Sequence, residues 1–296
     1  MGQDNPIMVE INSEGFRGPE LKASPAQRIV FIGDSVVFNG YVQQKETFTA
    51  LLEGQFRKDG HSVEIINAGT TDVGVKQYIL QARHNRFDRY KPELIITGLY
   101  LNDSRPPQGF LGENQDQLFN FLSHSPLRHL AFTHYIKQAY VAWRTKRGDI
   151  YSERFDWIAR FNSDAWKDDL GQFRQTVREA RFDWGAAWYP SFKRLVYPAI
   201  MEIRDLYVKK GVKFAVVLFP VSLQVHTSLT DLFIDYPQRQ LSMFAKKENV
   251  PFLDLLPLMR KEKNRRLFVD QAHLTRKGNQ IVAHIIYPFL KGLLEK

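Results

Sequence analysis

Two kinds of segment alternate along the chain, and each has its own spacing of apolar residues. Short continuous runs rich in Val, Ile, Leu or Phe predict strands that are covered on both faces of a sheet. These runs are residues 28–33, 62–69, 93–99, 213–219 and 251–256. Between them, apolar residues recur at intervals of three and four, which is typical of one face of a helix. The alternation predicts an α/β domain with a parallel sheet of five strands.

Two helices have clear end signals. In 46–60, Phe48, Leu51, Leu52 and Phe56 share one face, and Gly60 suits the C-terminal cap. In 274–294, Thr275 is a candidate N-cap, and Pro288 predicts a kink or an early end.

The alternation breaks between about residues 104 and 190. This stretch is rich in Phe, Tyr and Trp and indicates several helices inserted into the domain. We therefore expect a single domain over 28–296 with a helical, aromatic-rich insertion at about 104–190. Residues 1–27 contain residue types that are common in turns and one aromatic side chain that can anchor the segment. We therefore expect an N-terminal extension packed on the core.

The composition narrows the function classes. The chain has 296 residues, 44% of them hydrophobic, and no cysteine, which excludes disulfides, thiolate metal sites and a thiol nucleophile. The net charge is +9, but the basic residues are scattered and accompany no nucleic-acid motif, so we expect no nucleic-acid partner. No apolar run approaches the ~20 residues of a membrane span. We expect membrane contact only through an anchor that precedes the sequence.

Ser35 carries the first candidate chemistry. It follows the run "RIVFIGDS" at the carboxyl end of the first predicted strand, where ligand sites form in α/β sheets. An ordinary polar turn is the alternative, because a serine hydroxyl is a poor nucleophile without an adjacent base. His273 in "VDQAHLT" is the best candidate base, since Asp270 stands three residues earlier and one loop can present both side chains. His226 follows the fourth strand and is expected to line the site.

Four separated blocks then carry a family resemblance. They are "GDS" (33–35), "NAG" (67–69), "YLND" (100–103) and "DQAH" (270–273). With these blocks the chain resembles the SGNH hydrolases, also called the GDSL esterase/lipase family, of the bacterial envelope-associated type. The resemblance implies a three-layer α/β/α sandwich of flavodoxin-like topology with a mostly parallel five-stranded sheet.

The resemblance also implies the site residues. Ser35, His273 and Asp270 would form the catalytic triad, and the oxyanion hole would take N–H groups from Ser35, Gly69 and the Asn102 side chain. Two positions depart from the family pattern. Tyr100 replaces a glycine of the third block, so we expect Tyr100 to line the substrate pocket, and Gly40 comes one residue late after the first block.

The implied activity is cleavage of a short-chain acyl ester such as an acetyl ester, on a small molecule or a carbohydrate, through an acyl-enzyme. It requires no metal and no cofactor. The alternative is an O-acyltransferase or O-acetyltransferase that modifies a cell-envelope or exported polysaccharide with the same triad. A binding protein that retains the fold without catalysis is a third reading. The N-terminal "INSEGFRGPEL" resembles the lead-in of envelope-associated members and implies an extracytoplasmic, periplasmic or membrane-anchored location.

Overall fold

The computed structural model describes residues 6–23, 27–104, 121, 126, 130–146, 157–263 and 265–295. Its centre is a five-stranded sheet in the order β2-β1-β3-β4-β5, in which every neighbouring pair is parallel. The strands are β1 (Gln27–Gly33), β2 (Val63–Gly69), β3 (Leu94–Tyr100), β4 (Lys213–Phe219) and β5 (Phe252–Asp254). This order is the flavodoxin-like one, and the predicted fold class is confirmed.

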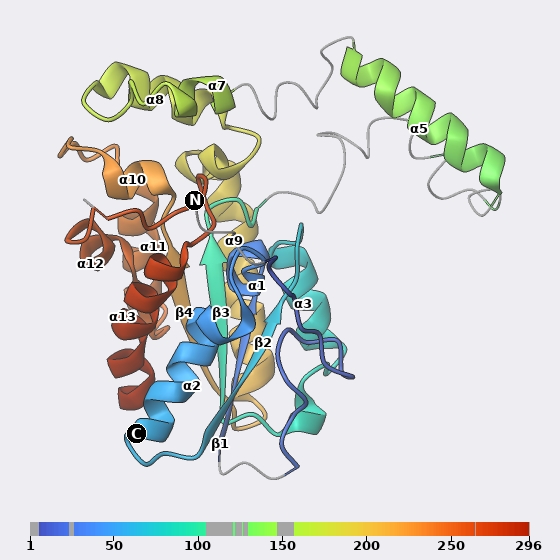
Figure 1. The fold of residues 1–296 in the computed structure, drawn as a ribbon, viewed down its shortest axis with the longest axis vertical. Coiled ribbons are helices and arrows are strands. Elements are labelled where there is room, and N and C mark those ends of the chain that lie inside the picture. Colours follow the sequence, from blue (N-terminus) through green and yellow to red (C-terminus); the bar gives the residue numbers. More distant parts are fainter. Residues whose placement is uncertain are drawn as a thin grey trace.

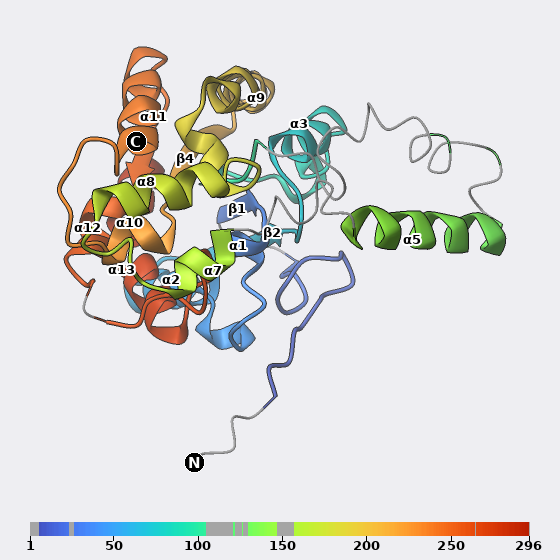
Figure 2. The same cartoon turned by 90° about the horizontal axis from the view of Figure 1, so that it is seen from above.

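Helices cover both faces of the sheet and make a three-layer sandwich (Figures 1 and 2). One face carries α1 (Ser35–Phe38), α2 (Phe48–Lys58) and α13 (Arg276–Leu294). The other face carries α3 (Val75–Arg83), α9 (Pro190–Val208) and α11 (Tyr236–Lys247). The remaining helical segments are α5 (Ala131–Lys146), α7 (Trp157–Asn162), α8 (Leu170–Glu179), α10 (Ser222–His226), α12 (Leu256–Arg260), η1 (Gln44–Glu46), η2 (Asp88–Tyr90) and η5 (Trp184–Trp188). Among the described helices, none has the length and apolarity that a membrane crossing needs.

The glycine predicted to end α2 is confirmed, and the structure adds an N-cap that was not predicted. The Thr47 side chain accepts from the Ala50 N–H at its start, and Gly60, with φ +82°, follows its end. The left-handed conformation of Gly60 lets the His61 N–H reach the Phe56 carbonyl at 2.9 Å.

The N-cap of α13 is confirmed. Of the kink or early end predicted at Pro288, the early end is wrong and the kink stays a prediction. The Thr275 hydroxyl accepts from the Gly278 N–H at 3.1 Å. The helix runs through Pro288 to Leu294. A proline removes one hydrogen bond, and the burial of Ile285, Ile286 and Leu290 around it holds the helix together.

The N-terminal segment covers the outer edge of β2. Phe16 is buried and packs edge-on against Tyr90, with ring centroids 5.3 Å apart. The Arg17 N–H donates to the Asn67 carbonyl of β2 at 3.2 Å. These contacts leave less of the strand edge open to another chain.

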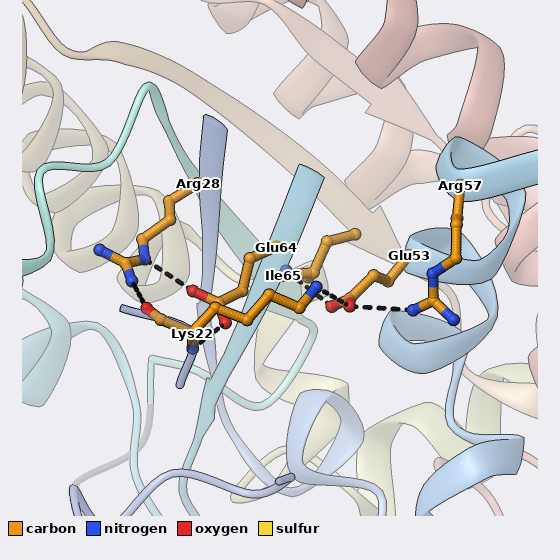
Figure 3. A network of polar contacts seen from close by, with 6 residues as sticks. All are labelled: Lys22, Arg28, Glu53, Arg57, Glu64 and Ile65. Atoms are coloured by element: carbon orange, nitrogen blue, oxygen red, sulfur yellow. Dashed lines mark hydrogen bonds and ion pairs between the residues drawn. The ribbon is translucent and has the colours of Figure 1, made fainter. Parts of the chain in front are cut away.

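Side chains complete the cover of this edge (Figure 3). A Glu53 oxygen accepts from the Ile65 N–H of β2 at 3.1 Å. Glu64 accepts from the Lys22 N–H and from the Arg28 side chain, both at 2.7 Å. The N-terminal segment, α2 and β2 are therefore linked through two carboxylates.

The described part of the predicted insertion is helical and aromatic. Trp184 packs edge-on against Trp157 and Trp188, with ring centroids 5.6 and 6.0 Å apart. α7 and α8 lie beyond the carboxyl ends of the strands (Figures 1 and 2). Most of residues 105–156 lies outside the described part, so the prediction for them stays a prediction.

The end of β5 carries an acid with a shifted pKa, and this generates the first prediction. Burial raises the pKa of Asp254 from 3.8 to about 6, and the bond from the Leu256 N–H opposes only part of that shift. The folded protein therefore binds this proton more tightly than the unfolded chain does. The stabilisation is complete below about pH 4 and is lost as the pH rises through about 6.

We expect Asp254→Asn to raise the free energy of unfolding by about 1–2 kcal/mol at pH 8 and to change it little at pH 4. The amide oxygen of the variant can still accept from Leu256. Urea unfolding of both proteins at the two pH values measures the difference. An equal effect at both values would contradict the assignment.

Candidate active site

Three glycines form a flat patch at the carboxyl ends of three adjacent strands, β2, β1 and β3. Gly33 of β1 is in register with Gly69 of β2 and with Gly98 of β3. A Cβ at Gly33 or Gly98 would lie 2.2 or 2.4 Å from the Val37 side chain, and one at Gly69 would lie 2.2 Å from the Phe38 nitrogen. No side chain fits at these positions because α1 lies directly on the sheet.

The patch and a local cap place Ser35 at the sheet edge. The Asp34 side chain accepts from the Val36 N–H at 2.9 Å and caps α1. Asn39, with φ +56°, ends the helix and donates its N–H to the Ser35 carbonyl at 2.8 Å. Each residue that follows the apolar strand therefore has its own role. Gly33 lets α1 pack closely on the sheet, Asp34 caps α1, and Ser35 presents its hydroxyl at the sheet edge.

The structure brings the three predicted triad side chains together. Ser35 Oγ lies 2.9 Å from His273 Nε2, and His273 Nδ1 lies 2.7 Å from Asp270 Oδ2. The other carboxylate oxygen, Asp270 Oδ1, accepts from the N–H groups of Ala272 and His273, both at 2.8 Å. One carboxylate thus holds both the loop and the imidazole.

The charge of Asp270 suits this arrangement. Burial raises its pKa, but the hydrogen bonds and charge of His273 and the bond from the Ala272 N–H outweigh burial and lower the pKa below its usual value. An ionised carboxylate accepts from Nδ1–H and leaves Nε2 as the nitrogen that faces Ser35. That tautomer can take a proton from the hydroxyl.

Contacts from the end of β3 and the start of α10 fix the Asp270–His273 loop. The Tyr100 hydroxyl donates to the Gln271 carbonyl at 3.2 Å, and the Ser222 N–H donates to the same oxygen at 2.8 Å. Tyr100 is 1% exposed, so its described role is to connect β3 to this loop. That it lines a substrate pocket stays a prediction.

The two predicted oxyanion donors beyond Ser35 differ in availability. Asn102 follows β3, and its side-chain oxygen is buried with no hydrogen-bond partner in the described part of the chain. Asn102 lies in a turn that Asp103 holds. The Asp103 carboxylate accepts from the Tyr100 N–H and from the Tyr78 hydroxyl, both at 2.9 Å. An amide on a rigid turn at this edge can point its N–H groups toward the serine.

Gly69 is different, because its N–H already has a partner. It donates to Asn67 Oδ1 at 3.0 Å, and Asn67 also donates to the Val37 carbonyl at 2.9 Å. Gly69 could serve an oxyanion only by exchanging this bond. Its described contribution is to let α1 approach the sheet, and its role as an oxyanion donor stays a prediction.

Sequence reasoning missed Arg17 as a residue that supports the site. Its guanidinium is buried, and it donates to the carbonyls of Phe38 (2.9 Å), Asn39 and Val42 (2.6 Å). Burial lowers the pKa of Arg17 from a very high value, with an opposing contribution from Glu10. In the sequence, the only signal for this supporting role is that Arg17 lies between Gly15 and Gly18.

The loop that Arg17 holds carries Tyr41, which sequence reasoning also missed. The Tyr41 ring lies 4.4 Å from the His273 ring, centroid to centroid, at an angle of 35°. Asn39 fixes the other side of the loop by donating to Asn279 of α13 at 2.5 Å. A half-exposed aromatic ring therefore flanks the imidazole of the triad.

His226 makes its described contacts elsewhere. Its Nδ1 lies 2.8 Å from the Lys263 carbonyl, and its ring packs edge-on against Phe268 at 5.8 Å. Burial lowers the pKa of His226. That it lines the substrate site stays a prediction. Within the described residues, no group of three or more His, Asp or Glu side chains is placed to hold a metal ion.

Comparison with known proteins gives distant structural similarity. No family model matches the chain, and no curated protein matches its sequence. The chain is similar to an acetyl xylan esterase, AlAXEase, at 14% identity and TM-score 0.46, over 88% of this chain and 98% of that one. It is also similar to a catalytic mutant of the acetylxylan esterase Axe2 from Geobacillus stearothermophilus, at 13% identity and TM-score 0.48, over 91% and 96%. A third structure, the esterase EstA from Pseudoalteromonas sp., shares 11% identity at TM-score 0.47, over 91% and 100%.

All three lie below 25% identity and below 0.5 in TM-score. The function is therefore inferred from the geometry of this chain's own residues.

The glycine patch generates the second prediction. We expect Gly69→Ala to destabilise the protein by about 1–3 kcal/mol, because its Cβ would overlap the backbone of α1, and to slow labelling of Ser35 by a fluorophosphonate at least tenfold. Thermal unfolding and mass spectrometry of the labelled serine measure the two effects.

Gly54→Ala is the matched control. Gly54 lies inside α2, and a Cβ added there would meet no atom within 4 Å, so alanine should stabilise by about 0.5–1 kcal/mol and leave labelling unchanged. Equal behaviour of the two variants would show that α1 does not depend on Gly69.

Proposed function

We propose that the protein is a serine hydrolase that cleaves an acyl ester. One observation carries this proposal: a continuous hydrogen-bonded chain runs from the Ser35 hydroxyl through His273 to the Asp270 carboxylate, with separations of 2.9 and 2.7 Å. These are the distances at which a base can activate a serine nucleophile. The serine also stands at the carboxyl edge of the sheet, where substrates reach it.

The first half of the reaction forms an acyl-enzyme. Ser35 Oγ attacks the ester carbonyl carbon while His273 Nε2 takes the hydroxyl proton, and Asp270 stabilises the resulting imidazolium. The negative charge that develops on the carbonyl oxygen is stabilised by N–H donors at the sheet edge, among which the Asn102 side-chain amide is the candidate. The C–O bond to the alcohol breaks, and His273 returns the proton to the departing oxygen.

The second half repeats these steps with water. His273 takes a proton from water, the hydroxyl attacks the acyl-enzyme, and the serine oxygen leaves with the proton from the imidazolium. The products are one alcohol and one carboxylic acid, and the enzyme is regenerated. Acetyl esters of small alcohols and of carbohydrates are the first substrates to test.

Transfer of the acyl group to a carbohydrate hydroxyl is the second candidate function. It uses the same groups and replaces water by a bound acceptor. The observation that favours it is a cavity beside the triad, which Tyr41 lines next to His273 and which has room for an acceptor.

The third prediction concerns Asp270. We expect Asp270→Asn to lower kcat/KM for p-nitrophenyl acetate about 10³–10⁴-fold with little change in melting temperature. An asparagine oxygen can still accept the two backbone N–H bonds, but its NH₂ group cannot accept from Nδ1–H, so the tautomer is lost. Stopped-flow release of p-nitrophenol measures the rate.

Two variants complete this test. Ser35→Ala should abolish both turnover and the acetyl-enzyme seen by mass spectrometry. Asp270→Ala should lower the melting temperature as well as the rate, since it also removes the loop's acceptor. Full activity of Ser35→Ala would end the proposal of a serine hydrolase.

The fourth prediction separates hydrolysis from transfer. With p-nitrophenyl acetate and cellotriose present together, a hydrolase releases one acetate for each p-nitrophenol. A transferase instead places acetyl on the sugar and releases much less free acetate. Mass spectrometry of the sugar and an acetate assay give the ratio, and we expect free acetate to account for most of the p-nitrophenol.

A further inference from the structure

A cavity of about 1280 Å³ opens between the N-terminal segment, α2 and the edge strand β2. Tyr41, Val269 and Thr275 are part of its lining and connect it to the triad. The Tyr41 ring lies against the His273 ring, and the Val269 N–H donates to the His273 carbonyl at 2.7 Å. The cavity therefore adjoins the histidine of the triad.

The side on which the cavity lies matters chemically. His273 Nε2 must give its proton to the oxygen of the departing alcohol, so this alcohol has to leave past the imidazole. Tyr41 is the residue that flanks the imidazole toward the cavity. The cavity also exceeds the roughly 300–1,000 Å³ of an ordinary small-ligand pocket, so it is far larger than a small acyl group needs.

We propose that this cavity is the binding site for the alcohol part of the ester, that this alcohol is a neutral carbohydrate, and that Tyr41 is its aromatic platform. The inference rests on the proposed serine esterase chemistry. It makes the N-terminal segment a wall of the substrate site.

The chemistry of Tyr41 suits a sugar. The side chain is 44% exposed, so part of its ring is open to a ligand while part contacts His273. Burial and the charge of Asp270 raise the pKa of its hydroxyl, which stays a neutral donor and acceptor. A flat apolar ring with a hydroxyl can pack against the C–H face of a pyranose and bond to its hydroxyl groups.

The platform is held in place before a ligand arrives. The Arg17 guanidinium donates to the carbonyls of Phe38, Asn39 and Val42, which surround Tyr41 in sequence. Asn279 holds Asn39 from the other side. Preorganisation of this kind lowers the entropy cost of binding.

The charge of the lining favours a neutral ligand. Acidic and basic side chains are equally common in it, five of each. Several neutralise one another: Glu53 lies 2.8 Å from Lys22 and 3.2 Å from Arg57 (Figure 3), and Arg276 lies 2.5 Å from Glu46. Such a lining offers both donors and acceptors to hydroxyl groups but little net attraction for a polyanion.

The fifth prediction tests the cavity with two substrates. The measured quantity is the kcat/KM for mono-O-acetyl cellotriose divided by that for p-nitrophenyl acetate. We expect the ratio to fall at least tenfold in Ala50→Phe, which fills the cavity from α2, and in Tyr41→Ala. Tyr41→Phe keeps the ring and should lose less than Tyr41→Ala.

Gly54→Phe is the matched control, because it adds the same bulk on the same helix outside the lining. It should leave the ratio unchanged. Melting temperature and labelling of Ser35 by a fluorophosphonate show that each variant is folded. As a second measurement, cellotriose should bind to the Ser35→Ala protein in an NMR titration, and Tyr41→Ala in that background should weaken binding at least tenfold.

Three outcomes would overturn the proposal. The first is a ratio that stays at the wild-type value in both Ala50→Phe and Tyr41→Ala while p-nitrophenyl acetate is still hydrolysed, which would leave the esterase function intact. The second is a wild-type preference for mono-O-acetyl trigalacturonate over the neutral sugar, which would contradict the charge argument. The third is wild-type protein that hydrolyses neither ester and does not react with the fluorophosphonate, which would end the proposed function as well.

Discussion

The close approach of α1 to the sheet is the constraint on which the site depends. Three glycines in register leave the sheet without side chains where α1 lies on it, and the position of the helix fixes Ser35. The backbone of the same helix and of the loop after it then supplies the carbonyls that Arg17 and Asn67 bind. If the helix lay further from the sheet, the hydrogen bonds of Arg17 and Asn67 to these carbonyls would break together, because a close-packed interior cannot expand locally to keep them.

The second half of the site comes from the far end of the chain. His273 is separated from Ser35 by 238 residues, and its loop is held by contacts from the end of β3 and from α10, which follows β4. Parallel strands that end at one edge make such a meeting possible without a long connection. The site therefore depends on the packing of the sheet, and its hydrogen bonds orient the side chains more than they contribute to the folding free energy.

Much of this could be predicted from the sequence, since strand runs and strand-end motifs are local. The five strands, the glycine that ends α2, the N-cap of α13 and the meeting of Ser35, His273 and Asp270 all follow from short patterns. The partner of the Gly69 N–H could not be predicted, because it depends on how Asn67 turns two residues earlier. The places of Arg17 and Tyr41 depend on a loop that packs against a distant segment, and α13 passes through Pro288 because tertiary burial outweighs one lost hydrogen bond.

Burial of Arg17 is costly, and its position gives a reason for the cost. A guanidinium held by backbone carbonyls keeps its charge without a bound carboxylate at hydrogen-bond distance in the described part of the chain, and desolvation lowers its pKa. An apolar residue could fill the same space, but it could not satisfy the carbonyls that follow α1. Those carbonyls face Arg17 at the point where Asn39, with φ +56°, ends the helix. The cation thus completes the turn that brings Tyr41 back to His273, and it links the N-terminal segment to the imidazole that faces Ser35.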